Sequence, residues 1–329
     1  MLRRTRRTLW IVAVVVLVLA AAVYLRFKAP PEAARLLPES DGILYMNVGL
    51  ARTVMQLMHT PLKPITKDPE YQKFVDAVGF DAERDLDEAA IAMHRMDNPN
   101  GPNGPVAYSM VLEGKIDGKK LAAWLAAHAT SQESYEGHTV YGIPSEGRTV
   151  RVAQIAYDTV AVSNFPSTEP IHSILDRHRT AALPFSGSTL LAEHYSEMPL
   201  LSVAWGMGQI GLPLGENGQI HIFGMGLPIP ASSTFLASVH WAGGLKVRVE
   251  EIADSDATAS QQAADLSLLL TLARGATAGL GANPANNGLK ELLKTATVTQ
   301  KRNRVVINAV LPKTLPAELA NGDGAGSQF

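Results

Sequence analysis

The chain has 329 residues, of which 46% are hydrophobic and 18% charged, a balance typical of one large or two modest globular domains and not of a disordered protein. Its net charge of -2 conceals an asymmetry, because residues 1–28 hold six basic and no acidic side chains, which leaves 23 basic against 31 acidic ones, or -8, in the rest. An acidic body does not attract a phosphate backbone, which argues against nucleic-acid binding; the absence of cysteine excludes disulfides, thiolate metal sites and cysteine nucleophiles.

An uncharged apolar segment occupies residues 9–25, directly after four arginines. As a helix it would span roughly 26 Å, which is enough to cross the hydrocarbon core of a bilayer. Because positive charges stay on the cytoplasmic side, we predict a signal-anchor. Residues 1–30 would form a cytoplasmic stub and membrane anchor, with the body outside the cell membrane, in the bacterial periplasm. The alternative is a signal peptide cleaved near Ala22, which would release the body as a secreted protein.

Local signals predict several elements after the anchor. An apolar run over 43–48 predicts a strand, and residues 51–59 are patterned as a helix. A further helix is predicted to begin after Asp68, with Pro69 at its first position, and to end before Gly79. This is the arrangement of a helix with a cap at each end.

The remainder of the chain repeats one plan, strand–strand–helix–strand–strand. The first copy has predicted strands at 89–95, 105–113, 138–143, 149–156 and 159–163 and helices at 117–129 and 168–178; the second has strands at 234–241, 245–252, 296–301 and 304–311 and helices at 256–274 and 287–294. Adjacent hairpins indicate mostly antiparallel sheets, so we predict an α+β fold with two similar subdomains, 31–183 and 184–319, whose helices pack on one face. Residues 320–329 are predicted to be a disordered tail.

The segment from Trp205 to Pro230, between the two copies, is unusual in length and composition. It holds seven glycines, three prolines and no Lys or Arg. A loop this long is often functional, and exposed apolar side chains in it would form a patch for a partner, an apolar ligand or the bilayer surface. The predicted contact residues are Ile210, Leu212, Leu214, Phe223, Met225 and Leu227. In the alternative interpretation the segment packs inward between the two halves, with Ile220 and Ile222 in an irregular strand.

Three patterns that could carry chemistry have simpler explanations. Residues 206–211 match G-x-G-x-x-G, but a dinucleotide site needs a helix after the third glycine, which Pro213 opposes. The acidic run at 81–87 lacks the glycine of a calcium loop, so we interpret it as a solvated turn. His194 and Glu197 could ligate a metal, yet without a partner motif we interpret them as surface residues.

Motifs for nucleophilic catalysis and phosphate binding are missing from the sequence. It contains neither G-x-S-x-G nor S-x-x-K, and no G-x-x-x-x-G-K-[ST], the patterns of common serine enzymes and of phosphate-binding loops. We therefore predict no catalytic, cofactor-binding or metal-binding residue, and no cofactor.

Three short stretches carry a resemblance to a known type of protein. They are residues 37–45 just after the anchor, the Gly-Phe-Asp step at 79–81, and Gly-Arg-Thr-Val at 147–150. On these stretches the chain resembles bacterial membrane-anchored proteins with a duplicated α+β extracytoplasmic region, a domain of unknown function. The resemblance implies the topology and transfers no active site.

These observations favour a membrane-anchored extracytoplasmic binding or interaction module without a catalytic site. Its partners would be the membrane, through residues 9–25, and an envelope protein or an apolar ligand, and not nucleic acid. Two alternatives remain at this point: an extracytoplasmic hydrolase with a site not recognisable from sequence, and a structural subunit of an envelope complex. A deep cleft with convergent polar groups would favour the hydrolase, whereas a broad apolar patch would favour a binding partner.

Overall fold

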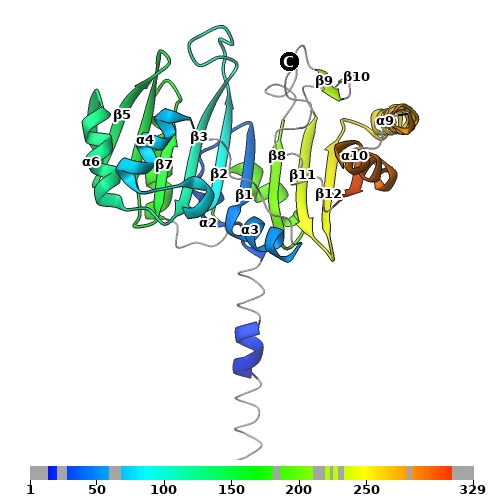
Figure 1. Cartoon of the computed structure of the whole chain (residues 1–329), viewed down its shortest axis with the longest axis horizontal. Coiled ribbons are helices and arrows are strands. Elements are labelled where there is room, and N and C mark those ends of the chain that lie inside the picture. The colour runs from blue at the N-terminus through cyan, green and yellow to red at the C-terminus, as the bar shows by residue number, and fades with distance from the viewer. Residues whose placement is uncertain are drawn as a thin grey trace, which may run out of the picture.

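A computed structural model describes the chain over residues 14–20, 28–58, 68–180, 186–209, 219–222, 225–228, 233–279 and 284–312. Over these ranges the body is built around a 12-stranded sheet, with a separate two-stranded sheet above one end (Figure 1). All strand pairs in both sheets are antiparallel. The coarse prediction, an α+β fold with antiparallel strands, is therefore confirmed.

The strands are β1 (Gly42–Asn47), β2 (Leu86–Arg95), β3 (Val106–Gly114), β4 (Ser131–Tyr135), β5 (His138–Ser145), β6 (Arg148–Gln154), β7 (Thr159–Ser163), β8 (Ser202–Gly208), β9 (Gln219–Ile222), β10 (Met225–Pro228), β11 (Thr234–Trp241), β12 (Leu245–Ile252), β13 (Thr297–Lys301) and β14 (Arg304–Val310). The helices are α2 (Glu32–Leu36), α3 (Val48–Leu57), α4 (Pro69–Val78), α5 (Ala82–Asp85), α6 (Gly118–His128), α7 (Glu169–Arg179), α8 (Thr189–His194), the 3-10 helix η1 (Tyr195–Glu197), α9 (Asp256–Ala278) and α10 (Pro284–Thr295).

The order of strands in the large sheet is β13-β14-β12-β11-β8-β1-β2-β3-β7-β6-β5-β4. Strands from both halves of the chain thus belong to one sheet, joined by the β1–β8 pair, in which Gly42 lies opposite Gly208. The two halves of the sheet follow the same scheme outward from this pair. Each begins with a lone strand, continues with a hairpin, and then has the last and the second-last strand of that half. The first half reads β1-β2-β3-β7-β6 and the second reads β8-β11-β12-β14-β13. The two predicted sheets are therefore halves of one continuous sheet.

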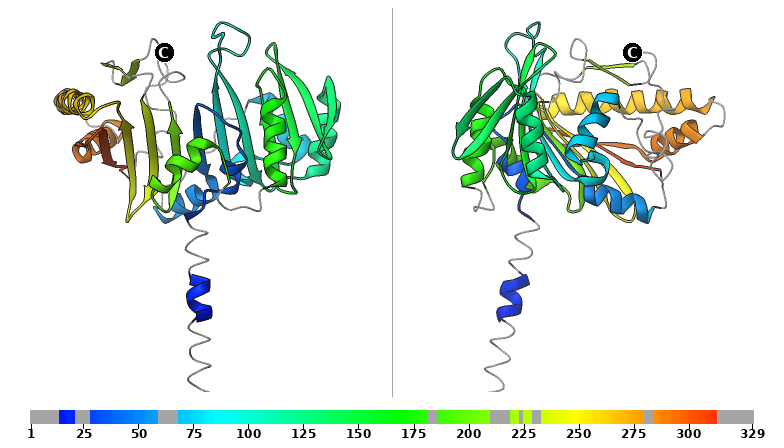
Figure 2. Two further views of the ribbon diagram at one scale, coloured as in Figure 1. Left: turned by 180° about the vertical axis from the view of Figure 1, so that it is seen from behind. Right: turned by 60° about the vertical axis from the view of Figure 1, so that its left-hand side comes forward.

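Helices cover both faces of the sheet, so the prediction of helices on one face is wrong. Figure 1 shows α3, α4 and α6 on the side toward the viewer, the front face, and Figure 2 shows α7 and α8, in green, on the opposite side, the back face. Neighbouring strand residues are buried on opposite sides: Val152 and Val160 belong to the core under α6, whereas Ala153 and Ala161 belong to the core under α7. A strand that is apolar without alternation is typical of burial on both faces, and β7 reads Thr-Val-Ala-Val-Ser.

The elements with strong local signals lie where the sequence predicts them. Helix α4 has Asp68 as its N-cap, Pro69 at its start and Gly79 just after its end, where φ is +79°. The left-handed backbone at that position favours glycine. The hairpin between β11 and β12 turns at Gly243, where φ is +73°, as the glycine pair predicted.

The described part of the N-terminal segment is short. Residues 14–20 are helical, and the side chains from Val14 to Leu19 are between 51% and 69% exposed. The rest of the predicted 9–25 anchor lies outside the described residues. Among the residues that are described, no helix is both long enough and apolar enough to span a bilayer.

Candidate functional site

The front face carries a cavity of about 320 Å³ between α4, α6 and strands β3, β5, β6 and β7, which we term the front cavity. Of the 14 described residues that line it, 13 are apolar, and the remaining one is Ser145. Its volume falls at the lower end of the range of small-molecule sites, which are mostly apolar and concave. A cavity with one hydroxyl in its lining offers an apolar molecule contact and offers a charged molecule almost no polar partner.

Two aromatic side chains line the front cavity on the side formed by the helices. Phe74 of α4 meets Trp124 of α6 edge to face, with ring centroids 5.1 Å apart. Leu121 and Leu125, also on α6, are 6% and 2% exposed. Aromatic pairs in this geometry add roughly 0.5–1.5 kcal/mol beyond their buried area, so the pair fixes the spacing between the two helices.

The strand side of the front cavity reaches solvent at Ser145, which is exposed. Ile143, Val150 and Val162, on β5, β6 and β7, are only partly buried, although they pack against the same core. Apolar side chains are therefore accessible from solvent at this side, and this is where a ligand can enter.

A second cavity, the back cavity, lies on the back face and has a volume of about 900 Å³. It is enclosed by residues 28–35, by β1, β2 and β3, and by the chain from η1 into β8. Glu88 and Glu113 line it from directly opposite positions on β2 and β3. Tyr45 and Trp205 provide an aromatic wall, with stacked rings whose centroids are 5.1 Å apart.

Two carboxyl groups of the back cavity, those of Glu88 and Glu113, have raised pKa values. Burial, reinforced by the negative charges of Glu88, Glu32 and Asp158, raises the pKa of Glu113 to about 7. Burial also raises the pKa of Glu88, although a hydrogen bond with Tyr45 opposes this. The Asn47 Nδ2 group donates to Glu88 Oε1 at 3.3 Å. Both carboxyl groups are thus easier to protonate than a glutamate in water.

The predicted contact residues of the 205–230 segment are only partly described. Ile210, Leu212, Leu214 and Phe223 lie outside the described residues. Met225 and Leu227 lie in β10, which pairs with β9 in the two-stranded sheet. Ile220 and Ile222 lie in β9. The role of this segment as a contact surface therefore stays a prediction.

The glycines at 206–211 have a structural role where they are described. Gly206 and Gly208 lie inside β8, which pairs with β1 and β11. At Gly208 the φ angle is +127°, and a Cβ atom would lie 2.3 Å from the Asp41 carbonyl oxygen. Only glycine fits there. The pattern therefore reflects close packing of a central strand.

The acidic run at 81–87 stabilises a helical turn. Asp81 caps α5 by accepting from the Glu83 amide. Asp85 is 7% exposed, accepts from the Asp81 amide at 2.9 Å and pairs with Arg84. The interpretation as a solvated turn is wrong for Asp85. No group of three or more His, Cys, Asp or Glu side chains among the described residues could hold a metal ion.

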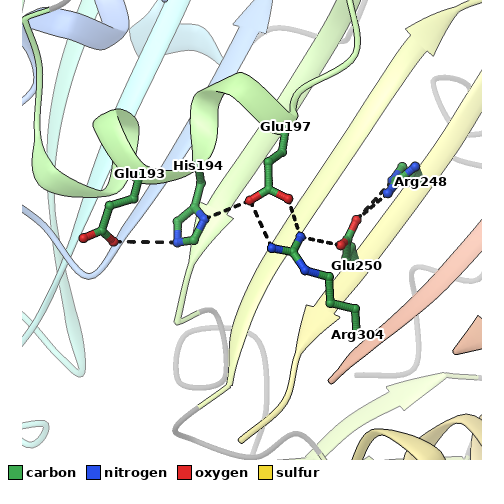
Figure 3. A network of polar contacts seen from close by, with 6 residues as sticks. All are labelled: Glu193, His194, Glu197, Arg248, Glu250 and Arg304. Carbon is green, nitrogen blue, oxygen red and sulfur yellow. Dashed lines mark hydrogen bonds and ion pairs between the residues drawn. The ribbon is translucent and has the colours of Figure 1, made fainter. Parts of the chain in front are cut away.

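His194 and Glu197 belong to a network of polar contacts that ties η1 to the sheet (Figure 3). The His194 Nδ1 atom lies 3.3 Å from Glu197 Oε1, and Glu197 pairs with Arg304. The Arg304 Nη1 atom also lies 2.6 Å from Oε1 of Glu250, whose side chain is only 4% exposed. Although burial alone would raise the pKa of Glu250, hydrogen bonds from Arg248 and Arg304 hold that pKa below its ordinary value. These partners occupy the carboxylates, which explains the site without a metal.

A buried Ser–His cluster was not predicted from the sequence. His94 Nε2 lies 2.9 Å from Ser109 Oγ, which lies 3.0 Å from Ser163 Oγ. Both serines are 0% exposed, and burial lowers the pKa of His94. No substrate can reach a hydroxyl that is fully buried, so the cluster satisfies polar groups within the sheet. Only the cross-strand register of Ser109 and Ser163 brings it together, and no local motif announces it.

No family model and no curated protein matches the sequence. Among solved structures, the chain is similar to crystal forms III, IV and I of TP0453, at 12%, 12% and 11% identity and TM-scores of 0.47, 0.45 and 0.44. The alignments cover 89%, 91% and 89% of this chain and 99%, 99% and 98% of the others. At these values the likeness carries no inference about function.

Proposed function

We propose that the chain is a membrane-anchored extracytoplasmic binding protein that holds an apolar ligand in the front cavity. The observation that carries the proposal is the lining of that cavity, in which 13 of 14 residues are apolar. Each methylene group moved from water into such a site contributes roughly 0.8 kcal/mol. A slender hydrocarbon such as an acyl chain fits this chemistry.

The charged or polar end of such a ligand would stay outside the front cavity. Ser145 is the only polar residue among the described residues of the lining, and an ionised group buried without partners is strongly disfavoured. The open side near Ile143 and Val150 is where the head group would meet solvent. The proposal therefore concerns an amphiphile bound by its tail.

This part of the proposal is tested by titrating the full chain in non-ionic detergent below its critical micelle concentration with the fluorescent acyl probe cis-parinaric acid. We expect saturable enhancement with one probe per chain, displaced by a saturated fatty acid and not by a short polar alcohol. Fluorescence that rises linearly without saturation would contradict a defined site.

We also propose that the two halves arose by gene duplication. The matching order of strands about the β1–β8 pair and the resemblance to anchored, duplicated α+β proteins support this. Both halves build outward from a central strand through a hairpin. In this view α6 and α9 are equivalent, since each follows the hairpin of its half.

The proposed anchor rests on residues 9–25 and the arginines before them. Trypsin added to intact spheroplasts should degrade the body and spare a small membrane-bound fragment, because the positive flank keeps the N-terminus inside. A cytoplasmic marker protein must survive the same treatment. A body that stays protected until the membrane is opened with detergent would refute the topology.

A further inference from the structure

The back cavity brings two carboxylates together at a cost to the fold. Glu88 and Glu113 face each other across β2 and β3, and like charges at directly opposite positions are destabilising. Glu32 lines the same cavity. The charges that act most strongly on Glu113 are all negative, so the field at this point favours a cation.

Aromatic rings lie beside these carboxylates. Trp205 stacks on Tyr45 and meets Tyr195 at a steep angle, with ring centroids 5.6 Å apart in the second pair. All three residues line the back cavity. The faces of such rings attract organic cations.

The combination of carboxylates and rings suits an organic ammonium group better than a metal ion. A hard metal ion needs several oxygen ligands at short range, and the described residues hold no cluster of three or more metal-ligating side chains. An ammonium group carries methyl or methylene groups that can pack on rings while its charge lies near carboxylates.

We propose that the back cavity binds an organic ammonium group, with Glu88 and Glu113 balancing its charge and Tyr45, Tyr195 and Trp205 contacting its carbon atoms. This site is separate from the front cavity and does not depend on the proposed function. The same chemistry is found in free amines and in the head group of an amine-containing phospholipid.

Because of the position of the back cavity, a lipid head group is tested separately from a free amine as the source of the ammonium group. Residues 28–31, next to the predicted anchor, line it together with Leu200 and Leu201. These leucines are 54% and 56% exposed, and Leu201 has a φ of +58°, a conformation that favours glycine. The cavity thus has an apolar rim on the side where the chain would enter the bilayer.

Other charged groups around the back cavity also influence how cation binding depends on pH. Lys28 and Arg35 line it as cations, and Arg35 lies 3.8 Å from Glu32. Asp158 acts on Glu113 from outside the lining. Protonation of the glutamates should weaken cation binding, so affinity is expected to fall from pH 8 to pH 5.5.

The test is isothermal titration of the full chain in dodecyl maltoside with choline and ethanolamine at pH 8, and with 3,3-dimethyl-1-butanol as the neutral analogue of choline. We expect at least one amine to bind at least about tenfold more tightly than the alcohol. Glu88→Gln and Glu113→Gln should each weaken that binding about tenfold or more, whereas Glu146→Gln, in the turn between β5 and β6, should not. Circular dichroism checks that each variant is folded.

In the second arm, mixed micelles with phosphatidylethanolamine are compared with mixed micelles containing phosphatidylglycerol. Binding of the ethanolamine lipid alone assigns the site to a head group, and binding of free amines assigns it to soluble ligands. The proposal is overturned if neither form binds, if the alcohol binds as well as the amines, or if Glu88→Gln and Glu113→Gln leave binding unchanged.

Discussion

Replacing Val150 by tryptophan is expected to reduce binding of the acyl probe by about 100-fold or more, which corresponds to roughly 2.7 kcal/mol. Val150 lies on β6, lines the front cavity and is only partly buried. The added indole can therefore enter the cavity from its open side and occupy the volume that an acyl tail would need. The measurement is the same fluorescence titration with cis-parinaric acid.

The matched control is Val310→Trp, the same substitution on β14, where the side chain is 41% exposed and does not line the cavity. This variant should bind the probe as the natural chain does. Thermal unfolding of both variants checks that neither has lost its fold. Equal loss of binding in the two variants, or full binding by Val150→Trp, would rule out the front cavity as the ligand site.

The stability gained by Glu113→Gln is expected to grow with pH. The pKa of Glu113 is raised in the folded state to about 7 from an ordinary 4.5, chiefly by burial. Because this pKa is higher in the folded state, the protonated carboxyl stabilises the fold fully at pH values below the pKa in the unfolded chain. This stabilisation is lost as pH rises through about 7. Ionisation thus weakens the natural fold between about pH 4.5 and pH 7, while glutamine stays neutral.

After a discount for partial solvent exposure, the effect is about 1–2 kcal/mol, or a few degrees in melting temperature. Thermal unfolding of the natural chain and of Glu113→Gln at pH 5 and pH 8 measures it. The variant should melt higher than the natural chain at pH 8 and close to it at pH 5, and Glu146→Gln should show neither difference. A difference that is the same at both pH values would contradict an ionisation that opposes folding.

Elements with local signals could be predicted because a few adjacent residues determine them. Asp68, Pro69 and Gly79 define the two ends of α4 without help from the rest of the chain. By contrast, the sequence gives no sign of β4, because its residues, Ser-Gln-Glu-Ser-Tyr, are mostly polar and mostly exposed. An edge strand of this kind is held by its pairing with β5 and has no apolar face to reveal it.

The union of the two halves in one sheet could not be predicted from periodicity. It depends on the pairing of β1 with β8, about 160 residues apart in the sequence, and no local pattern specifies which apolar strands become neighbours. The glycines that permit the pairing were visible in the sequence. Their close approach to β1 gives them a different meaning from the nucleotide motif they resemble.

The candidate sites were beyond sequence reasoning for the same reason. Neither Glu88 nor Glu113 belongs to a recognisable sequence motif. The two become a pair only through the register of β2 and β3. The front cavity likewise needs α4 and α6 to cover strands from other parts of the chain. The most unusual segment of the sequence is 205–230, whereas the described cavities are lined mainly by regular elements.

The most direct test of ligand binding in the front cavity is photocrosslinking of the full chain with a diazirine-bearing palmitate, followed by peptide mass spectrometry. The proposal predicts adducts on peptides that contain α4 and α6 or the β5–β6 hairpin, at one label per chain, suppressed by excess unlabelled palmitate. Adducts confined to the 9–25 segment or to the 205–230 segment, or scattered labelling that palmitate does not suppress, would contradict it.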